Sequence, residues 1–379
     1  MALPRWAYLV RLLAVHIIKN SMKKLFYSFI LSLLFTCVFS AGAQNGKIND
    51  ERQTLLRFLG DMPERPPLNV DTLEKVRIDK GWRYKIKYLS EPADSLFNMP
   101  EDWIYAYLFI PDNHEKKKLP AIVAIHQDDI NFHIGKSEPA GLMGDSTMFY
   151  GLELFNRGYV VICPDRYYHA ERRLLSKNKS YNPNEIDPER DFFLQSYQVG
   201  ILFLKGRTHY SKEAYDLSRA VDLLYTLSYV DKEKIGTVGH SAGGLAMTYF
   251  MFYDTRVKLG VSSCGIFDIN RAFNFTYPQP MPSEFAIPNL AKSGYSSFDY
   301  VKHIAPRSLL LTRGKYEWGK NNKGSIAMVD EIEKFKTEYL DFDRNGDIKI
   351  IIFEDGGGHH SFPYAIRQEV YRWIDERLK

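Results

Sequence analysis

The chain has 379 residues, of which 45% are hydrophobic, 14% aromatic and 25% charged, and its formal net charge is +4. This composition excludes a wholly disordered, collagen-like or multi-span membrane protein, and three cysteines are too few for a disulfide-built scaffold. The 50 basic residues barely outnumber the 46 acidic ones, so we expect no nucleic-acid partner.

The first 43 residues have the order of a secretory signal. Met22 opens a short basic stretch, an apolar run covers residues 25–40, and Ala41-Gly42-Ala43 places small residues before a cleavage point. The apolar run is short for a membrane span, which needs about 20 residues. We therefore predict a signal peptide over Met22–Ala43, preceded by extra upstream residues, and a secreted or periplasmic protein without a membrane span.

Removal of residues 1–43 changes the charge balance. This segment holds five lysines and arginines and no acid, so the formal charge falls from +4 to −1 without it. The basic excess thus belongs to the signal and favours no anionic partner.

Cys163 and Cys264 lie in apolar runs, where buried, unreactive thiols are expected. Lipoprotein processing at Cys37 is a weaker alternative, because Thr36 precedes it where a small residue is usual.

The remaining chain divides into an extension and one large domain. Residues 44–75 are polar with a short helical pattern at 55–59, and we assign them to an N-terminal helical extension. Residues 76–379 are predicted as one α/β domain, interrupted by long insertions at about 166–210 and 265–301. Its strands are expected at 84–88, 104–109, 121–125, 159–162, 235–238, 259–261, 309–311 and 350–353, with the clearest helices at 214–227 and 365–378. Continuous apolar runs are typical of a mostly parallel sheet with helices on both faces.

The segment Gly239-His240-Ser241-Ala242-Gly243 is a G-x-S-x-G element between a predicted strand and a run of small residues. In that setting the pattern is typical of a sharp turn that lifts a serine hydroxyl above the sheet. The flanking glycines are expected because a side chain would clash in such a strained turn. We predict Ser241 as a nucleophile; the alternative is a glycine-rich packing turn.

A serine nucleophile needs a base, and the base needs an acid. The last strand is followed by a glycine-rich loop with two histidines, of which we favour His360 over His359 as the base. Glu317 follows the strand at 309–312 and is predicted as the acid, giving the order Ser, Glu, His. Glu354 and Asp355 are rival acids, and a solvated loop carboxylate is the alternative for Glu317.

Negative charge on a tetrahedral intermediate requires fixed hydrogen-bond donors. One is expected to be the backbone N–H of Ala242, at the start of the helix after the serine. The other is expected in the loop after residues 121–125, at the N–H of Gln127, give or take one residue. His126 is interpreted as a packed histidine at the strand end.

At these residues the chain resembles the dienelactone-hydrolase-related α/β-hydrolases, in particular the secreted bacterial acetyl-xylan-esterase-like branch. The matching segments lie at 119–127, 135–142, 157–165, 216–220, 230–244 and 304–307, within a likeness that spans roughly 50–379. The family's acid is usually Asp three residues after a Gly, where this chain has Glu317 after Gly314. The family's His-x-Phe run is matched by His360-Ser361-Phe362.

The resemblance implies an α/β-hydrolase fold with lid insertions and a serine esterase that needs no cofactor. Its substrate is expected to be a small-molecule or polysaccharide ester, with carbohydrate acyl groups such as acetyl favoured. Three alternatives stay open: a peptidase of the same fold, a glucuronoyl or feruloyl esterase, and a binding protein that has lost the chemistry. The sequence gives no basis for the oligomeric state.

Two weaker patterns concern metals and pocket residues. Asp341–Asp347 resembles half of a calcium loop, but position 12 is Ile352 instead of Glu, so we interpret it as a turn. The histidines lack zinc-site spacing, and we expect no metal. Polar residues after the strand at 159–162 are either pocket residues or ion-paired loop anchors. These are Asp165, Arg166, Glu171 and Arg172.

Overall fold

The computed structural model describes residues 50–115, 117–128, 132–173, 187–266, 268, 285–317, 330, 332–335, 337 and 347–379. The predicted signal peptide and most of the calcium-like loop lie outside these residues. The chain divides into two units, Met1–Thr54 and Leu55–Lys379, and the sheet and the candidate site belong to the second. The proposed division at residue 75 and the two insertions stay predictions.

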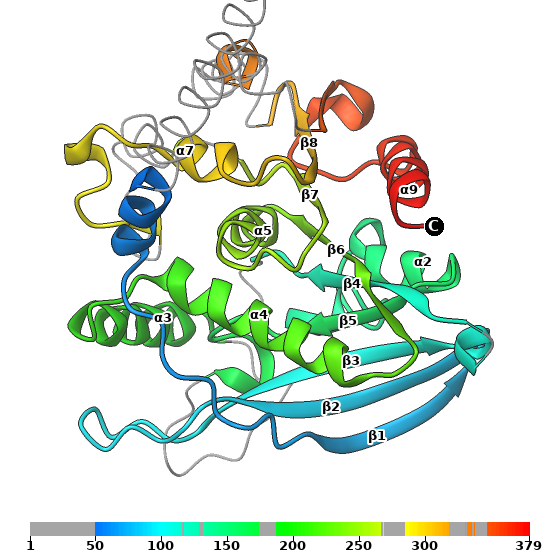
Figure 1. Cartoon of the computed structure of the whole chain (residues 1–379), viewed down its shortest axis with the longest axis horizontal. Helices are drawn as coiled ribbons and strands as arrows, with labels where there is room; N and C mark the ends of the chain where they lie inside the picture. Colours follow the sequence, from blue (N-terminus) through cyan, green and yellow to red (C-terminus); the bar gives the residue numbers. More distant parts are fainter. Residues whose placement is uncertain are drawn as a thin grey trace, which may run out of the picture. The chain divides into compact units, whose positions relative to one another are not determined.

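The core of the second unit is a sheet of nine strands in its described residues. The order across the sheet is β1-β2-β3-β5-β4-β6-β7-β8-β9, with antiparallel pairing from β1 to β5 and parallel pairing from β5 to β9 (Figure 1). The strands are β1 (Asp71–Ile78), β2 (Gly81–Glu91), β3 (Asp102–Pro111), β4 (Leu119–Ile125), β5 (Val160–Pro164), β6 (Val230–His240), β7 (Leu259–Ser263), β8 (Ser308–Gly314) and β9 (Ile348–Phe353).

Helices cover both faces of this sheet. Figure 1 shows α4 and α5 on one side and α2 and α9 on the other. The α-helices are α2 (Tyr150–Asn156), α3 (Pro188–Leu204), α4 (His209–Thr226), α5 (Ala242–Tyr253), α7 (Ser297–Lys302) and α9 (Tyr364–Leu378), and residues 50–59 are also helical. Short 3-10 turns are η1 (Asp112–Glu115), η2 (Gly135–Ser137), η3 (Ser146–Met148), η4 (Ala170–Arg172), η6 (Ala291–Ser293) and η7 (Asp355–Gly358).

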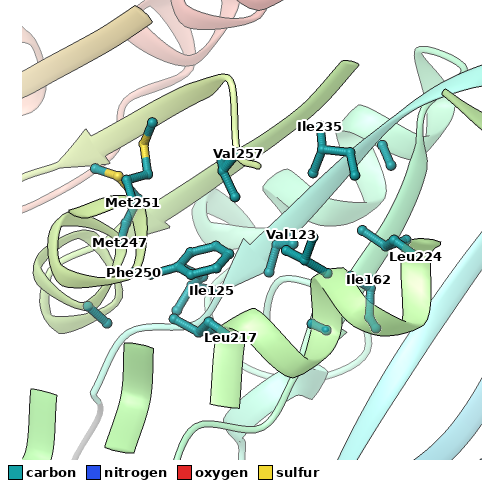
Figure 2. Packing of buried hydrophobic residues seen from close by; sticks show 14 of the residues in the cluster. Val123, Ile125, Ile162, Leu217, Leu224, Ile235, Met247, Phe250, Met251 and Val257 are labelled. Atoms are coloured by element: carbon teal, nitrogen blue, oxygen red, sulfur yellow. The ribbon is translucent and has the colours of Figure 1, made fainter. Parts of the chain in front are cut away.

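This arrangement confirms the predicted fold class. The packing of β4 shows why a strand at the centre of such a sheet has apolar side chains on both faces. Val123 and Ile125 pack with Leu217 of α4 and Phe250 of α5, as Figure 2 shows. Ile122 and Ala124 alternate with them and join a second cluster with residues of α2 and α9. Because successive side chains of a strand point to opposite faces, a strand covered on both faces must be apolar throughout.

The prediction missed β1 and α3. β1 is an edge strand whose side chains are mostly exposed, so no alternation marks it. α3 falls in the segment assigned to a long connection, and it leaves Phe192 and Phe193 exposed while it buries Gln195 and Gln198. No helix among the described residues is both long enough and apolar enough to cross a bilayer.

The parallel pairing brings the carboxyl ends of six strands to one edge of the sheet. Ile125 pairs with Gly239, His240 with Ser263, and Gly314 with Phe353. The residues that follow these strand ends are therefore neighbours in space, although they are far apart in the sequence. In open α/β sheets this edge is where ligands bind.

We expect Phe250→Ala to lower the free energy of unfolding by about 3–5 kcal/mol, because it leaves a cavity between α5 and the sheet. Phe250 is fully buried, whereas Phe193 on α3 is 71% exposed. Phe193→Ala is the matched control and should change the free energy by less than about 0.5 kcal/mol. Urea denaturation measures both, and equal losses would contradict the packing described.

Candidate active site

Ser241 stands in the strained turn between β6 and α5. Its φ of 54° and ψ of −124° are unfavourable for a residue with a side chain, at a cost of about 1–3 kcal/mol. A Cβ on Gly239 would lie 2.2 Å from the carbonyl oxygen of Gly243, and one on Gly243 would lie 2.4 Å from that of His126. Both flanking positions of the motif therefore require glycine. The N–H of Ser241 donates to the carbonyl of Ser263 at 2.8 Å, which ties the turn to β7.

His360 lies beside the serine. Its Nε2 is 2.7 Å from Ser241 Oγ, and its side chain is 33% exposed, so a substrate can reach the pair. The loop that carries it passes through three glycines with positive φ, residues 356–358. The ring of His359 instead folds back over Gly357, where an added Cβ would lie 2.7 Å from its Nε2. The geometry pairs His360, and not its neighbour, with the serine.

Glu317 faces the other nitrogen of His360. Its Oε1 is 3.5 Å from His360 Nδ1, longer than the roughly 2.7–3.2 Å of a hydrogen bond, and has no hydrogen-bond partner among the described residues. Its Oε2 accepts a hydrogen bond from Arg313. Burial alone raises the pKa of the Glu317 carboxyl, but Arg313 and His360 outweigh burial and hold that pKa below its usual range. Glu317 is therefore ionised at neutral pH.

The rival acids point elsewhere. Glu354 is exposed and pairs with Lys315 at 2.6 Å, and Asp355 is exposed as well. Backbone hydrogen bonds join the loop of Glu317 to the loop of His360: the N–H of Tyr316 donates to the carbonyl of Gly358 at 2.8 Å. Main-chain contacts between the two loops therefore set the distance between Glu317 and His360.

The loop after β4 lies against the start of α5. The carbonyl of His126 touches Gly243, which brings Gln127 and Ala242 to the same end of the sheet. His126 Nε2 accepts from the N–H of Arg166 at 2.9 Å, so its proton is on Nδ1, 2.7 Å from the carbonyl of Gln127. Burial, with help from His169 and Arg166, lowers the pKa of His126 well below its usual value, so the ring is neutral. It is a packed strand-end histidine.

The polar residues after β5 are ion-paired anchors. Arg166 donates to Glu213 at 2.6 Å and also pairs with Asp128, which follows Gln127. The further pairs are Lys136 with Asp165 and Glu171, and Arg172 with Asp102 and Asp216. Arg166 also packs with Asp128, His209 and Ala242 around a gap too small for a water molecule. The contacts of Arg166 therefore fit the interpretation as an ion-paired anchor.

Sequence reasoning missed two groups at the acid. Arg313 lies four residues before Glu317, near the end of β8. An arginine and a glutamate at that spacing could have indicated their ion pair. Cys264 is buried, and its Sγ lies near Glu317 and 3.5 Å from the carbonyl of Ser361. Cys264, Glu317 and His360 have potential metal-binding atoms within 4.8 Å of one another, the one such set in the described residues.

We expect Glu317→Gln to lower the free energy of unfolding by about 3–5 kcal/mol at pH 7, because it leaves the buried Arg313 without its carboxylate. The folded-state pKa of Glu317 is depressed, so its contribution is complete above its ordinary value of 4.5 and is lost as pH falls through the folded value. The difference between the two proteins should therefore shrink below about pH 4.5.

Urea denaturation across this pH range measures the difference. Glu354→Gln, which removes an exposed pair with Lys315, is the control and should change stability little at any pH. A Glu317→Gln effect that is independent of pH would contradict the ion pair.

Comparisons with known proteins agree with this architecture. The profile of the prolyl oligopeptidase family matches residues 204–365. YtaP of Bacillus subtilis (strain 168), provisionally described as a hydrolase, is 26% identical over 330 residues, which cover 87% of this chain and 99% of the relative.

Two solved structures share the fold. A protein of Bacteroides fragilis NCTC 9343, provisionally described as an acetyl xylan esterase, is 17% identical with a TM-score of 0.67, covering 88% of this chain and 87% of that one. A glucuronoyl esterase from Solibacter usitatus is 14% identical with a TM-score of 0.53, covering 86% and 91%. The chain has the α/β-hydrolase fold, its predicted likeness to acetyl xylan esterases is confirmed, and the hydrolase class expected from the sequence agrees with these relatives.

Proposed function

We propose that the protein is a serine esterase in which Ser241, His360 and Glu317 form the catalytic triad. The observation that carries the proposal is the 2.7 Å contact between Ser241 Oγ and His360 Nε2, with Glu317 on the opposite side of the imidazole. A serine hydroxyl is a weak nucleophile until a neighbouring base accepts its proton. The exposed histidine and the buried carboxylate supply that base and its partner.

In the first half of the reaction, Ser241 Oγ attacks the ester carbonyl carbon while its proton moves to His360 Nε2. The carbonyl oxygen becomes an oxyanion, which the N–H groups of Ala242 and Gln127 stabilise. The ionised Glu317 carboxylate, 3.5 Å from Nδ1, stabilises the imidazolium by its charge. His360 then gives its proton to the leaving alkoxide, so that an alcohol departs and an acyl group stays on Ser241.

In the second half, water attacks the acyl-enzyme. His360 takes a proton from the water, a second tetrahedral intermediate forms in the same oxyanion site, and the proton returns to Ser241 Oγ as the carboxylic acid leaves. The balance of atoms needs only ester and water, so no cofactor takes part in this scheme.

For the substrate, we propose a carbohydrate acyl ester such as an acetylated sugar, and for the location, secretion or the periplasm. The substrate proposal is supported by the relatives described as acetyl xylan and glucuronoyl esterases. The location is supported by the basic, apolar and small-residue segments over Met22–Ala43.

A peptidase of the same fold is the second candidate, and the match of residues 204–365 to the prolyl oligopeptidase family favours it. Amide and ester hydrolysis use the same triad, so the site geometry alone does not separate the two. Turnover of p-nitrophenyl acetate without turnover of peptide p-nitroanilides would support the esterase. The reverse preference would support the peptidase.

We expect Ser241→Ala and His360→Ala each to lower kcat for p-nitrophenyl acetate by about 10⁴-fold or more, because each removes a member of a unit that acts together. His359→Ala is the matched control and should retain activity within about threefold, since its ring faces Gly357. Release of p-nitrophenol by purified protein measures all three. Loss of activity in His359→Ala with activity retained in His360→Ala would overturn the assignment of the base.

A further inference from the structure

A cysteine thiol lies beside the proposed triad, near the carboxylate that faces the histidine. Cys264 comes directly after β7, whereas Glu317 and His360 lie in the loops after β8 and β9. Each of the three residues offers one potential ligand atom, and these atoms lie within 4.8 Å of one another. Because the three positions are far apart in the sequence, no ligand spacing links them. The proposed ester hydrolysis does not use the thiol.

Hydrogen bonds hold the three strand ends together. The N–H of Cys264 donates to the carbonyl of Thr312 in β8 at 2.8 Å, and the N–H of Tyr316 donates to the carbonyl of Gly358 at 2.8 Å. The Sγ of Cys264 lies 3.5 Å from the carbonyl oxygen of Ser361, the residue after the histidine. The three ligand atoms are therefore brought together before any ion binds, which lowers the cost of binding.

One carboxylate oxygen in this group has no partner. The side chain of Glu317 is only 1% exposed, and its Oε1 has no hydrogen-bond partner among the described residues. Arg313 donates to Oε2, so Oε1 is the oxygen that is left for another ligand. An unpaired acceptor that is buried and charged is costly, so a cation that reaches Oε1 is favoured.

The spacing of the ligand atoms fits a tetrahedral zinc ion. Zinc binds imidazole nitrogen and carboxylate oxygen at about 2.0–2.2 Å and thiolate sulfur at about 2.3 Å. At tetrahedral angles the nitrogen and oxygen therefore stand about 3.4 Å apart, and the sulfur stands about 3.6 Å from either. Glu317 Oε1 and His360 Nδ1 are 3.5 Å apart, too long for a hydrogen bond. The sulfur, within 4.8 Å of both, has to shift by at most about 1.2 Å.

The ligand types and their charges favour zinc over the common hard cations. Thiolate and imidazole are typical zinc ligands, whereas calcium and magnesium take oxygen ligands. Burial, together with the charge of Glu317, raises the pKa of the Cys264 thiol well above its usual value, so the thiol keeps its proton without a metal. A thiol that coordinates zinc loses its proton to solvent. The thiolate and the Glu317 carboxylate then balance the two charges of the ion.

We propose that Cys264 Sγ, Glu317 Oε1 and His360 Nδ1 bind a zinc ion, and that this ion reversibly inhibits the enzyme. Water supplies the fourth ligand, since His360 is partly exposed to solvent. The inhibition rests on the serine esterase function proposed above, whereas the metal site itself does not.

The inhibition follows from the position of the proton on the imidazole. In the active form Nδ1 of His360 carries the single proton of the ring, and Nε2 accepts the proton of Ser241, whose Oγ is 2.7 Å away. A zinc ion on Nδ1 displaces the ring proton, and the neutral ring then carries it on Nε2. Nε2 no longer accepts a proton from Ser241. Removal of the ion by a chelator returns the ring proton to Nδ1, and Cys264 regains a proton from solvent.

Metal binding is tested without turnover. Titration with Cd²⁺, which replaces zinc on thiolates, should produce the ultraviolet absorption band of a cadmium-bound thiolate. Cys264→Ser should abolish the band, and His360→Ala should weaken Cd²⁺ binding about tenfold or more. Cys163→Ala removes the other buried thiol of the described residues and is the matched control, which should keep the band. Cys264→Ala should behave as Cys264→Ser does and replaces it if the serine variant does not fold.

Inhibition is tested with p-nitrophenyl acetate, each variant being compared with its own metal-free rate. Zn²⁺ should inhibit the unaltered protein, a chelator should restore the rate, and Mg²⁺ or Ca²⁺ at the same concentration should have no effect. The inhibitory Zn²⁺ concentration should rise about tenfold or more in Cys264→Ser. It should change little in Cys163→Ala and in His359→Ala, whose ring faces Gly357.

The two measurements separate the possible failures. Absence of a band that depends on Cys264, or Zn²⁺ inhibition that is unchanged in Cys264→Ser, would overturn the site. A band that depends on Cys264 without any inhibition would overturn the inhibitory role. If the band depends on Cys264 and His360 but p-nitrophenyl acetate is not hydrolysed, the metal site stands and the esterase function fails.

Discussion

The close approach of α5 to the ends of β4 and β6 is the contact on which the site depends. It is possible only because Gly239 and Gly243 carry no side chain, and it forces Ser241 into a backbone conformation that ordinary residues avoid. The strain is held by the hydrogen bond from Ser241 to β7 and by the packing of α5 on the sheet. As a result Ser241 stands at the N-terminal end of α5, with its Oγ 2.7 Å from His360 Nε2.

The burial of the ion pair between Arg313 and Glu317 is the second constraint on the site. Arg313 and Glu317 form an ion pair that is almost inaccessible to solvent, and such a pair is retained only where its geometry is good. It fixes one carboxylate oxygen on the guanidinium and leaves the other facing His360. The carboxylate proposed to orient the histidine therefore depends on an arginine outside the proposed triad, while His360 itself is partly exposed to solvent.

Much of this arrangement could be predicted from the sequence because the signals are local. The strand at 121–125 is apolar throughout because both its faces are covered, and the glycines of the serine turn are required within five residues. The features that the sequence did not reveal depend on ion-pair partners far along the chain, or on a helix that buries polar residues and exposes aromatic ones. Lys136 is buried only because Asp165 and Glu171, far along the chain, pair with it, and α3 buries Gln195 and Gln198 while it exposes Phe192 and Phe193.

The central claim is that Ser241 is a nucleophile activated by His360. Labelling with a fluorophosphonate, followed by mass spectrometry of tryptic peptides, tests it most directly, since the reagent reacts much faster with a serine whose proton has an acceptor than with an ordinary serine. We predict one adduct per chain, on Ser241, that is lost in Ser241→Ala and strongly slowed in His360→Ala. A label on another residue, or labelling that survives Ser241→Ala, would contradict the account.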